Sequence, residues 1–305
     1  MFVLLLVLIQ TTAILSTQDI ALSQTYKPEV LGASTAVPAP IINKPKDNPQ
    51  TSIIQTKNPD LSDVSAQSFL VFDLDSGQEL LSKNPTQKLA IASLTKLMTA
   101  LAAYNNSNLN KTFAITSKNI LNVKPDLGLA IGDEVKALDV FNSMLIGSCN
   151  DAAKALADFT SQSSGSNFVD LMNGQAAVLG MVNSSFSNPM GFDNSDNYST
   201  AEDLKLLITN TQHFTDFTDL GRMTGYKFSG ALGKIYSATA TNLLIKNHPD
   251  IQAVKTGFTN EANGAMATKV AIGGHQIIIL VLDSQNREGD TLKLKSAVET
   301  SFNWE

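Results

Sequence analysis

Six consecutive apolar residues, Ile277 to Leu282, are the feature that most restricts how this chain can fold. A strand with one face in water alternates apolar and polar residues, so an unbroken apolar run predicts a strand that is well buried. A second strand-like segment, residues 265–272, precedes the run, and Gly273-Gly274 between the two is typical of a tight turn. The C-terminal part therefore predicts a long antiparallel hairpin, with a further strand over residues 251–255.

Another hairpin is predicted much earlier in the chain, with strands at residues 69–72 and 79–81 around a turn at 75–77. Residues 112–142 hold short strand-like pieces and a glycine-rich turn. The remaining periodic segments predict helices. These helices are expected over residues 93–104, 151–159 and 168–179, from a capping box at 200–203 onward, and over 292–302.

Strands at both ends and helices in the middle predict an α+β fold of the broad α/β class. The two hairpins are expected to join one antiparallel sheet flanked by helices. The middle of the chain is expected to form a helical lobe over about residues 97–215. A ligand site is expected in the cleft between the sheet and this lobe.

The N-terminal region predicts an exported protein. Residues 2–9 are an apolar run too short for a full bilayer span, and Ala21-Leu22-Ser23 places small residues where signal peptidase cleaves. No Lys or Arg precedes the run, which departs from the usual leader. We expect residues 1–23 to be a signal peptide or, if uncleaved, an N-terminal membrane anchor.

Residues 24–60 are expected to be a linker, because six of the ten prolines precede residue 61 and apolar periodicity is absent. The catalytic domain is then expected over residues 61–305. The formal net charge of −6, without a Lys/Arg cluster, excludes nucleic acid as an expected partner. One cysteine and three scattered histidines predict no disulfide, metal site or cofactor.

Three short motifs carry the chemistry, and they occur in a fixed order. They are Ser93-Leu94-Thr95-Lys96, Ser148-Cys149-Asn150 and Lys255-Thr256-Gly257. Each is weak alone, but together they match the signature of class A β-lactamases and penicillin-binding proteins.

The first motif has the geometry of an activated nucleophile. Ser93 and Lys96 are three residues apart at a helix start, so they share a face. A serine hydroxyl needs a base within hydrogen-bond reach, and a lysine can act as that base only when it is neutral. Burial and a second cation such as Lys255 would both lower the pKa of Lys96.

Simpler interpretations exist for each motif. Ser93, Ser148 and Asn150 could merely cap helices, and Lys255 could be a charge on an edge strand. Gly257 argues for a site, because a glycine within a strand often marks the close approach of another backbone or of a ligand.

Residues 65 to about 285 resemble the D-alanyl-D-alanine carboxypeptidases, which are low-molecular-mass penicillin-binding proteins with a β-lactamase/transpeptidase-like fold. The resemblance rests on residues 92–100, 144–146, 188–193, 198–201 and 255–259. It implies that Ser93 is the nucleophile, Lys96 its base and Ser148 a proton relay. It further implies that Asn150 holds the substrate amide, that Lys255 and Thr256 hold its carboxylate, and that the N–H groups of Ser93 and Phe258 form the oxyanion hole.

The resemblance implies a carboxypeptidase that trims D-Ala-D-Ala ends of peptidoglycan stem peptides, with a role in cell-wall biogenesis and cell shape. We expect β-lactams to inhibit it, and we expect an exported monomer on the outer side of the cytoplasmic membrane, free or tethered. Cys149 stands where the family usually has glycine and is interpreted as a packing residue.

Several alternatives remain open at this stage. The chain ends one helix past the sheet, like short relatives that include endopeptidases. A β-lactamase is disfavoured, because Glu202 is the only glutamate between the second and third motifs and lies outside a Glu-x-x-Leu-Asn segment. An inactive muropeptide-binding module is a non-enzymatic alternative, and glutaminases and esterases with a Ser-x-x-Lys motif are a remote one.

Overall fold

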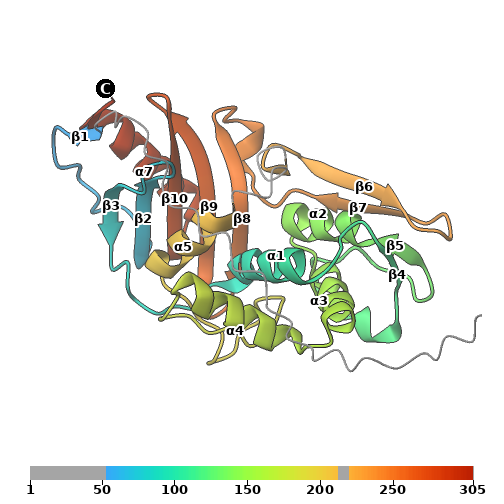
Figure 1. The fold of residues 1–305 in the computed structure, drawn as a ribbon. Coiled ribbons are helices and arrows are strands. Elements are labelled where there is room, and N and C mark those ends of the chain that lie inside the picture. Colours follow the sequence, from blue (N-terminus) through green and yellow to red (C-terminus); the bar gives the residue numbers. More distant parts are fainter. Residues whose placement is uncertain (1–52, 212–219, 305) are drawn as a thin grey trace, which may run out of the picture. The chain divides into compact units, whose positions relative to one another are not determined.

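A five-stranded antiparallel sheet forms the centre of the protein (Figure 1). A computed structural model describes residues 53–211 and 220–304. The strand order β3-β2-β10-β9-β8 brings the two predicted hairpins side by side, because β10 pairs with β2 as well as with β9. The strands are β2 (Ser68–Asp73), β3 (Glu79–Lys83), β8 (Ile251–Thr259), β9 (Asn263–Ile272) and β10 (His275–Ser284).

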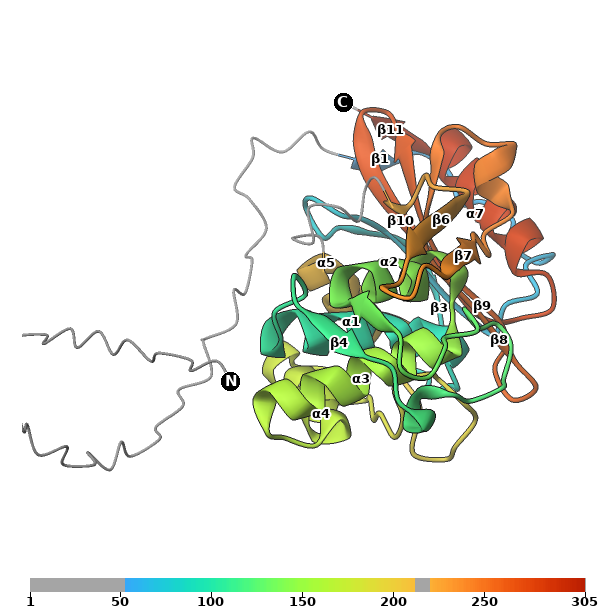
Figure 2. The same cartoon turned by 90° about the vertical axis from the view of Figure 1, so that its right-hand side faces the viewer.

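Helices cover the sheet from both sides (Figures 1 and 2). One side faces the lobe that contains α1 to α5, and the other is covered by α7. This confirms the predicted α+β architecture. The helices are α1 (Thr95–Asn106), α2 (Ala137–Gly147), α3 (Asn150–Ser164), α4 (Phe168–Leu179), α5 (Ala201–Thr211) and α7 (Arg287–Ser301), with 3-10 turns η1 (Ala92–Leu94), η2 (Ser117–Asn119) and η3 (Leu244–Lys246).

The apolar run of β10 is explained by these two layers. Alternate side chains Ile278, Leu280 and Leu282 enter the core shared with the helical lobe. The intervening side chains Ile277, Ile279 and Val281 enter the core shared with α7. Since neighbouring residues of a strand point to opposite faces, a strand covered on both faces has no position for a polar residue.

Two features of the lobe differ from the prediction, and a third agrees with it. Helix α2 was not expected, because short strands were predicted over residues 112–142 and no side chain caps the start of the helix. The lobe also includes a hairpin of β6 (Gly225–Ser229) and β7 (Ile235–Thr239) that packs on α2. The pair β4 (Thr112–Ala114) and β5 (Glu134–Lys136) matches the short strands expected there.

The predicted capping box of α5 forms only in part. Thr200 Oγ1 accepts a hydrogen bond from the Asp203 N–H at 3.0 Å, as a helix cap does. The Asp203 carboxylate does not return the bond, because its Oδ2 accepts from Asn183 N and Ser184 Oγ instead. The cap therefore also fastens the loop that follows α4.

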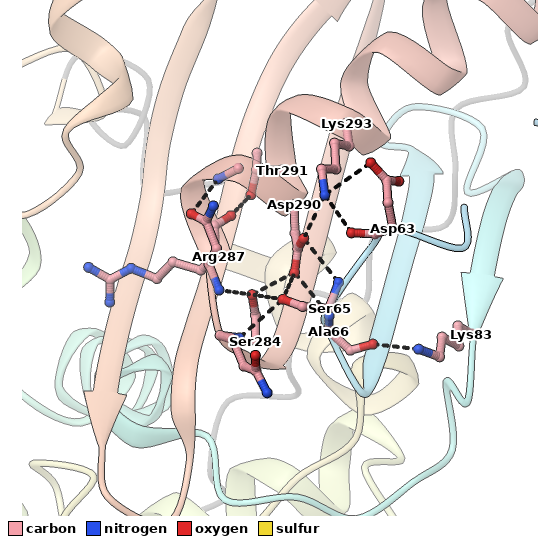
Figure 3. Close-up of polar contacts among 12 residues, drawn as sticks. Asp63, Ser65, Ala66, Lys83, Ser284, Arg287, Asp290, Thr291 and Lys293 are labelled. Carbon is pink, nitrogen blue, oxygen red and sulfur yellow. Dashed lines mark hydrogen bonds and ion pairs between the residues drawn. The ribbon is translucent and has the colours of Figure 1, made fainter. Parts of the chain in front are cut away.

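The first turn of α7 is tied to the start of β2 through Asp290 (Figure 3). Its buried carboxylate accepts hydrogen bonds from Ser65 N and Oγ, from Ala66 N and from Ser284 Oγ. Burial alone would raise the pKa of Asp290, but these hydrogen bonds hold it below its usual value. Arg287, the first residue of the same turn, is thereby held in place beside the sheet (Figure 3).

The folded domain begins earlier than the predicted boundary at residue 61. Strand β1 (Ile53–Gln55) pairs antiparallel with β11 (Phe302–Trp304), and Gln78 Nε2 donates to the Ile53 carbonyl at 2.9 Å. Residues 53–55 of the predicted linker are thus part of the domain, because they form a strand that pairs with the C-terminal strand β11. The predicted leader and residues 24–52 of the predicted linker lie outside the described residues. No helix within residues 53–211 and 220–304 combines the length and hydrophobicity that a membrane span requires.

A pair of neighbouring substitutions tests this boundary. Ile53 is 4% exposed and belongs to the core under α7, whereas Ile54 is 50% exposed. Ile53→Ala should lower the free energy of unfolding by about 2–3 kcal/mol, because it leaves a cavity in that core. Ile54→Ala should change it by less than about 0.5 kcal/mol. Urea unfolding measures both free energies. Equally small effects of the two substitutions would contradict the inclusion of residues 53–55 in the folded domain.

Candidate active site

The three motifs lie together where η1 and the helical lobe meet β8. Hydrogen bonds join them directly. Lys96 Nζ donates to Ser93 Oγ at 2.9 Å and to Asn150 Oδ1 at 2.9 Å, and Lys255 Nζ donates to Ser148 Oγ at 2.8 Å. The motifs span more than 160 positions in sequence, so only the tertiary fold brings them into contact.

The Ser93 side chain is half-buried and the Lys96 amine fully buried. Ser93 lies in the 3-10 turn η1, so Lys96, on the first turn of α1, faces its hydroxyl. Burial lowers the pKa of Lys96 to about 7, because a cation loses its hydration in the protein interior. A substantial fraction of the amine is then neutral at neutral pH.

The other partners of Lys96 set the direction of its lone pair. Met190 O accepts at 2.7 Å, and Asn150 Oδ1 is also only an acceptor. The Asn150 amide cannot be turned over, since its Nδ2 donates to the carbonyls of Val123 and Lys124. In the neutral amine both N–H bonds are therefore committed to these acceptors, which leaves the lone pair for the Ser93 hydroxyl.

The absence of a side chain at Gly257 permits the contact between β8 and the nucleophile. A Cβ at this position would lie 2.9 Å from Ser93 N and 2.9 Å from the Ala92 Cβ, too close for any residue but glycine. The close backbone approach predicted for Gly257 is thus present. On the other side of η1, Gly191 has φ +83° and packs against the Ala92 carbonyl, so glycine is required there too.

Ser148 and Lys255 form a second polar pair in the same site. Ser148 ends α2 in the left-handed conformation, with φ 56°, which is strained for a residue other than glycine. The Lys255 amine donates to Ser148 Oγ and to the Thr256 carbonyl. Burial, followed by the positive charges of Lys96 and Arg287, lowers the pKa of Lys255 well below its usual value.

The surroundings of two expected site residues, Asn150 and Phe258, bear on the roles that the resemblance implies for them. Both N–H groups of the buried Asn150 amide are occupied by the protein, so it supports Lys96 and has only an oxygen lone pair left for a substrate amide. Phe258 follows Gly257 on β8, and its side chain is 67% exposed.

Cys149 is buried, and its environment does not suit a nucleophile. Burial raises the pKa of its thiol to about 12, so the thiolate is not populated at neutral pH. Its sulfur lies against the end of α2, where a Cβ on Gly147 would be 2.9 Å away. This agrees with its interpretation as a packing residue.

Two further residues reach the motifs from other parts of the chain, and the sequence analysis did not predict either of them. Arg287 Nη1 donates to the Gly257 carbonyl at 2.6 Å. Thr241 Oγ1 lies 2.5 Å from Thr256 Oγ1. Neither residue stands in a motif, so no local pattern could have indicated their place.

Comparisons with known proteins agree with this geometry. Residues 53–286 match the family model of the D-alanyl-D-alanine carboxypeptidases, peptidase family S11. The chain is 29% identical to the D-alanyl-D-alanine carboxypeptidase DacF of Bacillus subtilis, over 78% of this chain and 62% of DacF. It is 30% identical to a D-alanyl-D-alanine endopeptidase of Pseudomonas aeruginosa, over 78% of each protein. The chain thus spans about three-fifths of the length of DacF.

Solved structures show the same fold. A variant of the Streptomyces K15 DD-transpeptidase superposes with a TM-score of 0.71 at 25% identity, covering 79% of this chain and 99% of the other. The cefotaxime-bound penicillin-binding protein D2 of Listeria monocytogenes superposes with a TM-score of 0.66 at 27% identity, with the same coverage. The architecture is therefore the β-lactamase/transpeptidase-like fold, and the chain belongs to the D-alanyl-D-alanine carboxypeptidase family.

Proposed function

We propose that this protein is a serine-type D-Ala-D-Ala carboxypeptidase that trims peptidoglycan stem peptides through an acyl-enzyme on Ser93. The observation that carries the proposal is the buried Lys96 amine, whose two N–H bonds are held by Met190 O and Asn150 Oδ1 so that its lone pair faces Ser93. This arrangement supplies the base that a serine nucleophile needs.

In the proposed reaction, Ser93 Oγ attacks the carbonyl carbon of the penultimate D-Ala while its proton moves to Lys96. The N–H groups of Ser93 and Phe258 stabilise the resulting oxyanion. Breaking the C–N bond releases the terminal D-Ala, whose amine receives a proton through Ser148, which is hydrogen-bonded to Lys255. Water then hydrolyses the ester and regenerates Ser93.

Positive charge is the basis of the proposed substrate recognition. Lys255, Thr256 and Arg287 surround the Gly257 segment. Among the described residues, no salt bridge joins Lys96 or Lys255 to a carboxylate. A C-terminal substrate carboxylate beside Lys255 would supply the missing partner and favour the protonated amine.

An endopeptidase is the second candidate. The Pseudomonas aeruginosa endopeptidase is matched over 78% of its own length, compared with 62% for DacF. A cross-linked peptide can also present a carboxylate beside its scissile bond, so the same site could accept it. Release of D-Ala from a pentapeptide, compared with cleavage of a cross-linked muropeptide dimer, distinguishes the two activities.

The β-lactamase alternative has less support. Glu202 is exposed on the first turn of α5, where its N–H donates to the Pro85 carbonyl, and no hydrogen bond joins it to a motif residue within the described part of the chain. No other glutamate lies between the second and third motifs. We therefore expect the penicillin adduct to persist.

We further propose that the protein acts outside the cytoplasmic membrane, because peptidoglycan is assembled there. We also propose that it acts as a monomer. The supporting feature is the apolar N-terminal run of residues 2–9. Residues 1–23 would serve as a cleaved signal peptide or as a tether, and mass spectrometry of the mature N-terminus distinguishes these outcomes.

Fluorescent penicillin should label the protein covalently, and Ser93→Ala should abolish the label, because it removes the hydroxyl that lies beside the Lys96 amine. Cys149→Ala should retain it, since the thiol is protonated. Gel fluorescence and mapping of the adduct by peptide mass spectrometry measure both results. An adduct on Cys149 in the Ser93→Ala protein would refute the assignment.

The acylation rate should rise with pH through about 7, because the pKa of Lys96 is about 7 and only the neutral amine can accept the Ser93 proton. At pH 6 the rate should be about tenfold below its plateau. Lys96→Arg should be inactive throughout, since a guanidinium stays protonated. Stopped-flow labelling between pH 5 and 9 tests this, and a flat profile would exclude Lys96 as the base.

A peptide that ends in a free D-Ala-D-Ala carboxylate should react much faster than its C-terminal amide. Loss of a charge-assisted hydrogen bond costs roughly 1.5–3 kcal/mol, or about one to two decades in kcat/KM. Thr256→Val should remove most of the preference while retaining the strand. Equal kcat/KM for acid and amide on the unmodified protein would contradict the role of Lys255 and Thr256.

A further inference from the structure

The loop of residues 188–192, between α4 and α5, carries the carbonyl that accepts a hydrogen bond from the Lys96 amine. Met190 O and Lys96 Nζ are 2.7 Å apart, and both residues are buried. The loop belongs to no helix or strand, so no regular ladder of hydrogen bonds fixes this carbonyl. Its direction therefore depends on the contacts that hold the loop.

The side chain of Asn188 holds the loop from within. Its Oδ1 accepts from three successive backbone N–H groups, those of Met190 at 3.2 Å, Gly191 at 2.8 Å and Phe192 at 3.0 Å. Within residues 53–211 and 220–304, no backbone carbonyl accepts from any of the three. Turning the Asn188 amide over would point its NH₂ group at these donors, and Nδ2 already donates to the Phe192 carbonyl at 3.1 Å.

The peptide between Met190 and Gly191 is held at both edges. Its N–H donates to Asn188 Oδ1, and its carbonyl accepts from Lys96 Nζ. This peptide is trans, so its N–H and C=O point in opposite directions. An acceptor on the N–H side thus aims the carbonyl at α1.

The preceding peptide is held in the same way. The Met190 N–H donates to Asn188 Oδ1, and the Pro189 carbonyl accepts from Thr99 Oγ1 at 2.8 Å. Thr99 is three residues after Lys96, on the same face of α1. Two successive peptides therefore lie between Asn188 and this face of the helix.

Gly191 makes the acceptor on Asn188 necessary. A Cβ on Gly191 would lie 2.0 Å from the Ala92 carbonyl oxygen, so the close packing on η1 requires glycine. Glycine also adopts many backbone conformations, so by itself it would let the Met190–Gly191 peptide turn over. A turned peptide would point its N–H at the Lys96 amine in place of the carbonyl.

We propose that Asn188, together with Thr99, is a positioning residue for acylation, because it aims the Met190 carbonyl at the Lys96 amine. The proposal rests on the role of base given above to Lys96. With the carbonyl in place, one N–H of the neutral amine is bound and the lone pair is directed at the Ser93 hydroxyl. Without it, the amine can rotate about its Cε–Nζ bond, and the proton of Ser93 is transferred less often.

Substitution of Asn188 in the full-length protein tests this role by stopped-flow labelling with fluorescent penicillin. In Asn188→Ala the limiting acylation rate should fall about ten- to a hundredfold, the effect of a misplaced catalytic group. The penicillin concentration that gives half of this rate should change less than about twofold, since binding is not altered. Asn167→Ala is the matched control, because Asn167 Oδ1 accepts from two N–H groups at the start of α4. It should change neither quantity.

The pH profile of Asn188→Ala separates aiming of the carbonyl from a general loosening of the loop. An oxygen that accepts from the amine favours its charged form, so its loss should leave the midpoint at or below the wild-type value of about 7. The titratable groups that act on Lys96 are Lys255 and Cys149, and both remain in the variant. If the loop only excluded water, the midpoint would rise toward the ordinary lysine value. Such a rise, or an unchanged limiting rate, would overturn the proposal.

A pair of substitutions at Thr99 decides the question even if urea unfolding shows that Asn188→Ala does not fold. Thr99→Val keeps the shape of the side chain but removes the donor to the Pro189 carbonyl. Its limiting acylation rate should fall about three- to tenfold, the effect of one neutral hydrogen bond. Thr99→Ser retains the hydroxyl and should recover most of this loss. Equal rates for the two variants would contradict the proposal.

The outcomes also separate this inference from the proposed function. A wild-type acylation rate that does not vary with pH contradicts Lys96 as the base and, with it, the role of Asn188. A wild-type rate that rises through pH 7, with the same limiting rate in Asn188→Ala, contradicts the role of Asn188 alone.

Discussion

The site depends on the burial of two lysine amines that form no salt bridge with a carboxylate in residues 53–211 and 220–304. Water would keep Lys96 and Lys255 charged, whereas the interior lowers both pKa values. Each amine is surrounded instead by neutral oxygens, from Ser93, Asn150 and Met190 for Lys96 and from Ser148 and Thr256 for Lys255. The site is thereby prepared both for a neutral base and for an anionic ligand.

The layered fold maintains this arrangement. Because β10 is buried on both faces, it fixes the sheet between α7 and the helical lobe. Strand β8, at the edge of this sheet, places Lys255 and Thr256 beside η1. Gly257 allows the backbones of β8 and η1 to meet. From the far side of the sheet, Asp290 anchors the first turn of α7, from which Arg287 reaches the Gly257 carbonyl.

Residues of the same motif have different tasks in this structure. Ser93 and Lys96 form the proposed reactive pair, while the fully paired Asn150 amide holds the lysine amine through its oxygen. Cys149, between Ser148 and Asn150, only packs, because its thiol is buried and protonated. In the proposed carboxylate-binding segment, the Thr256 hydroxyl is paired with that of Thr241, which lies outside the motif.

The sequence by itself determined the features that depend on near neighbours along the chain. Ser93 and Lys96 are one helical turn apart, the run from Ile277 to Leu282 excludes an exposed face, and Gly257 within a strand signals a close contact. Tertiary structure alone decided the rest. It pairs Ile53–Gln55 with the C-terminal strand β11, packs the β6–β7 hairpin on α2, and brings Arg287 and Thr241 to β8. These contacts join residues far apart in sequence. They are stabilised by packing and hydrogen bonds between distant segments, which a pattern of neighbouring residues cannot predict.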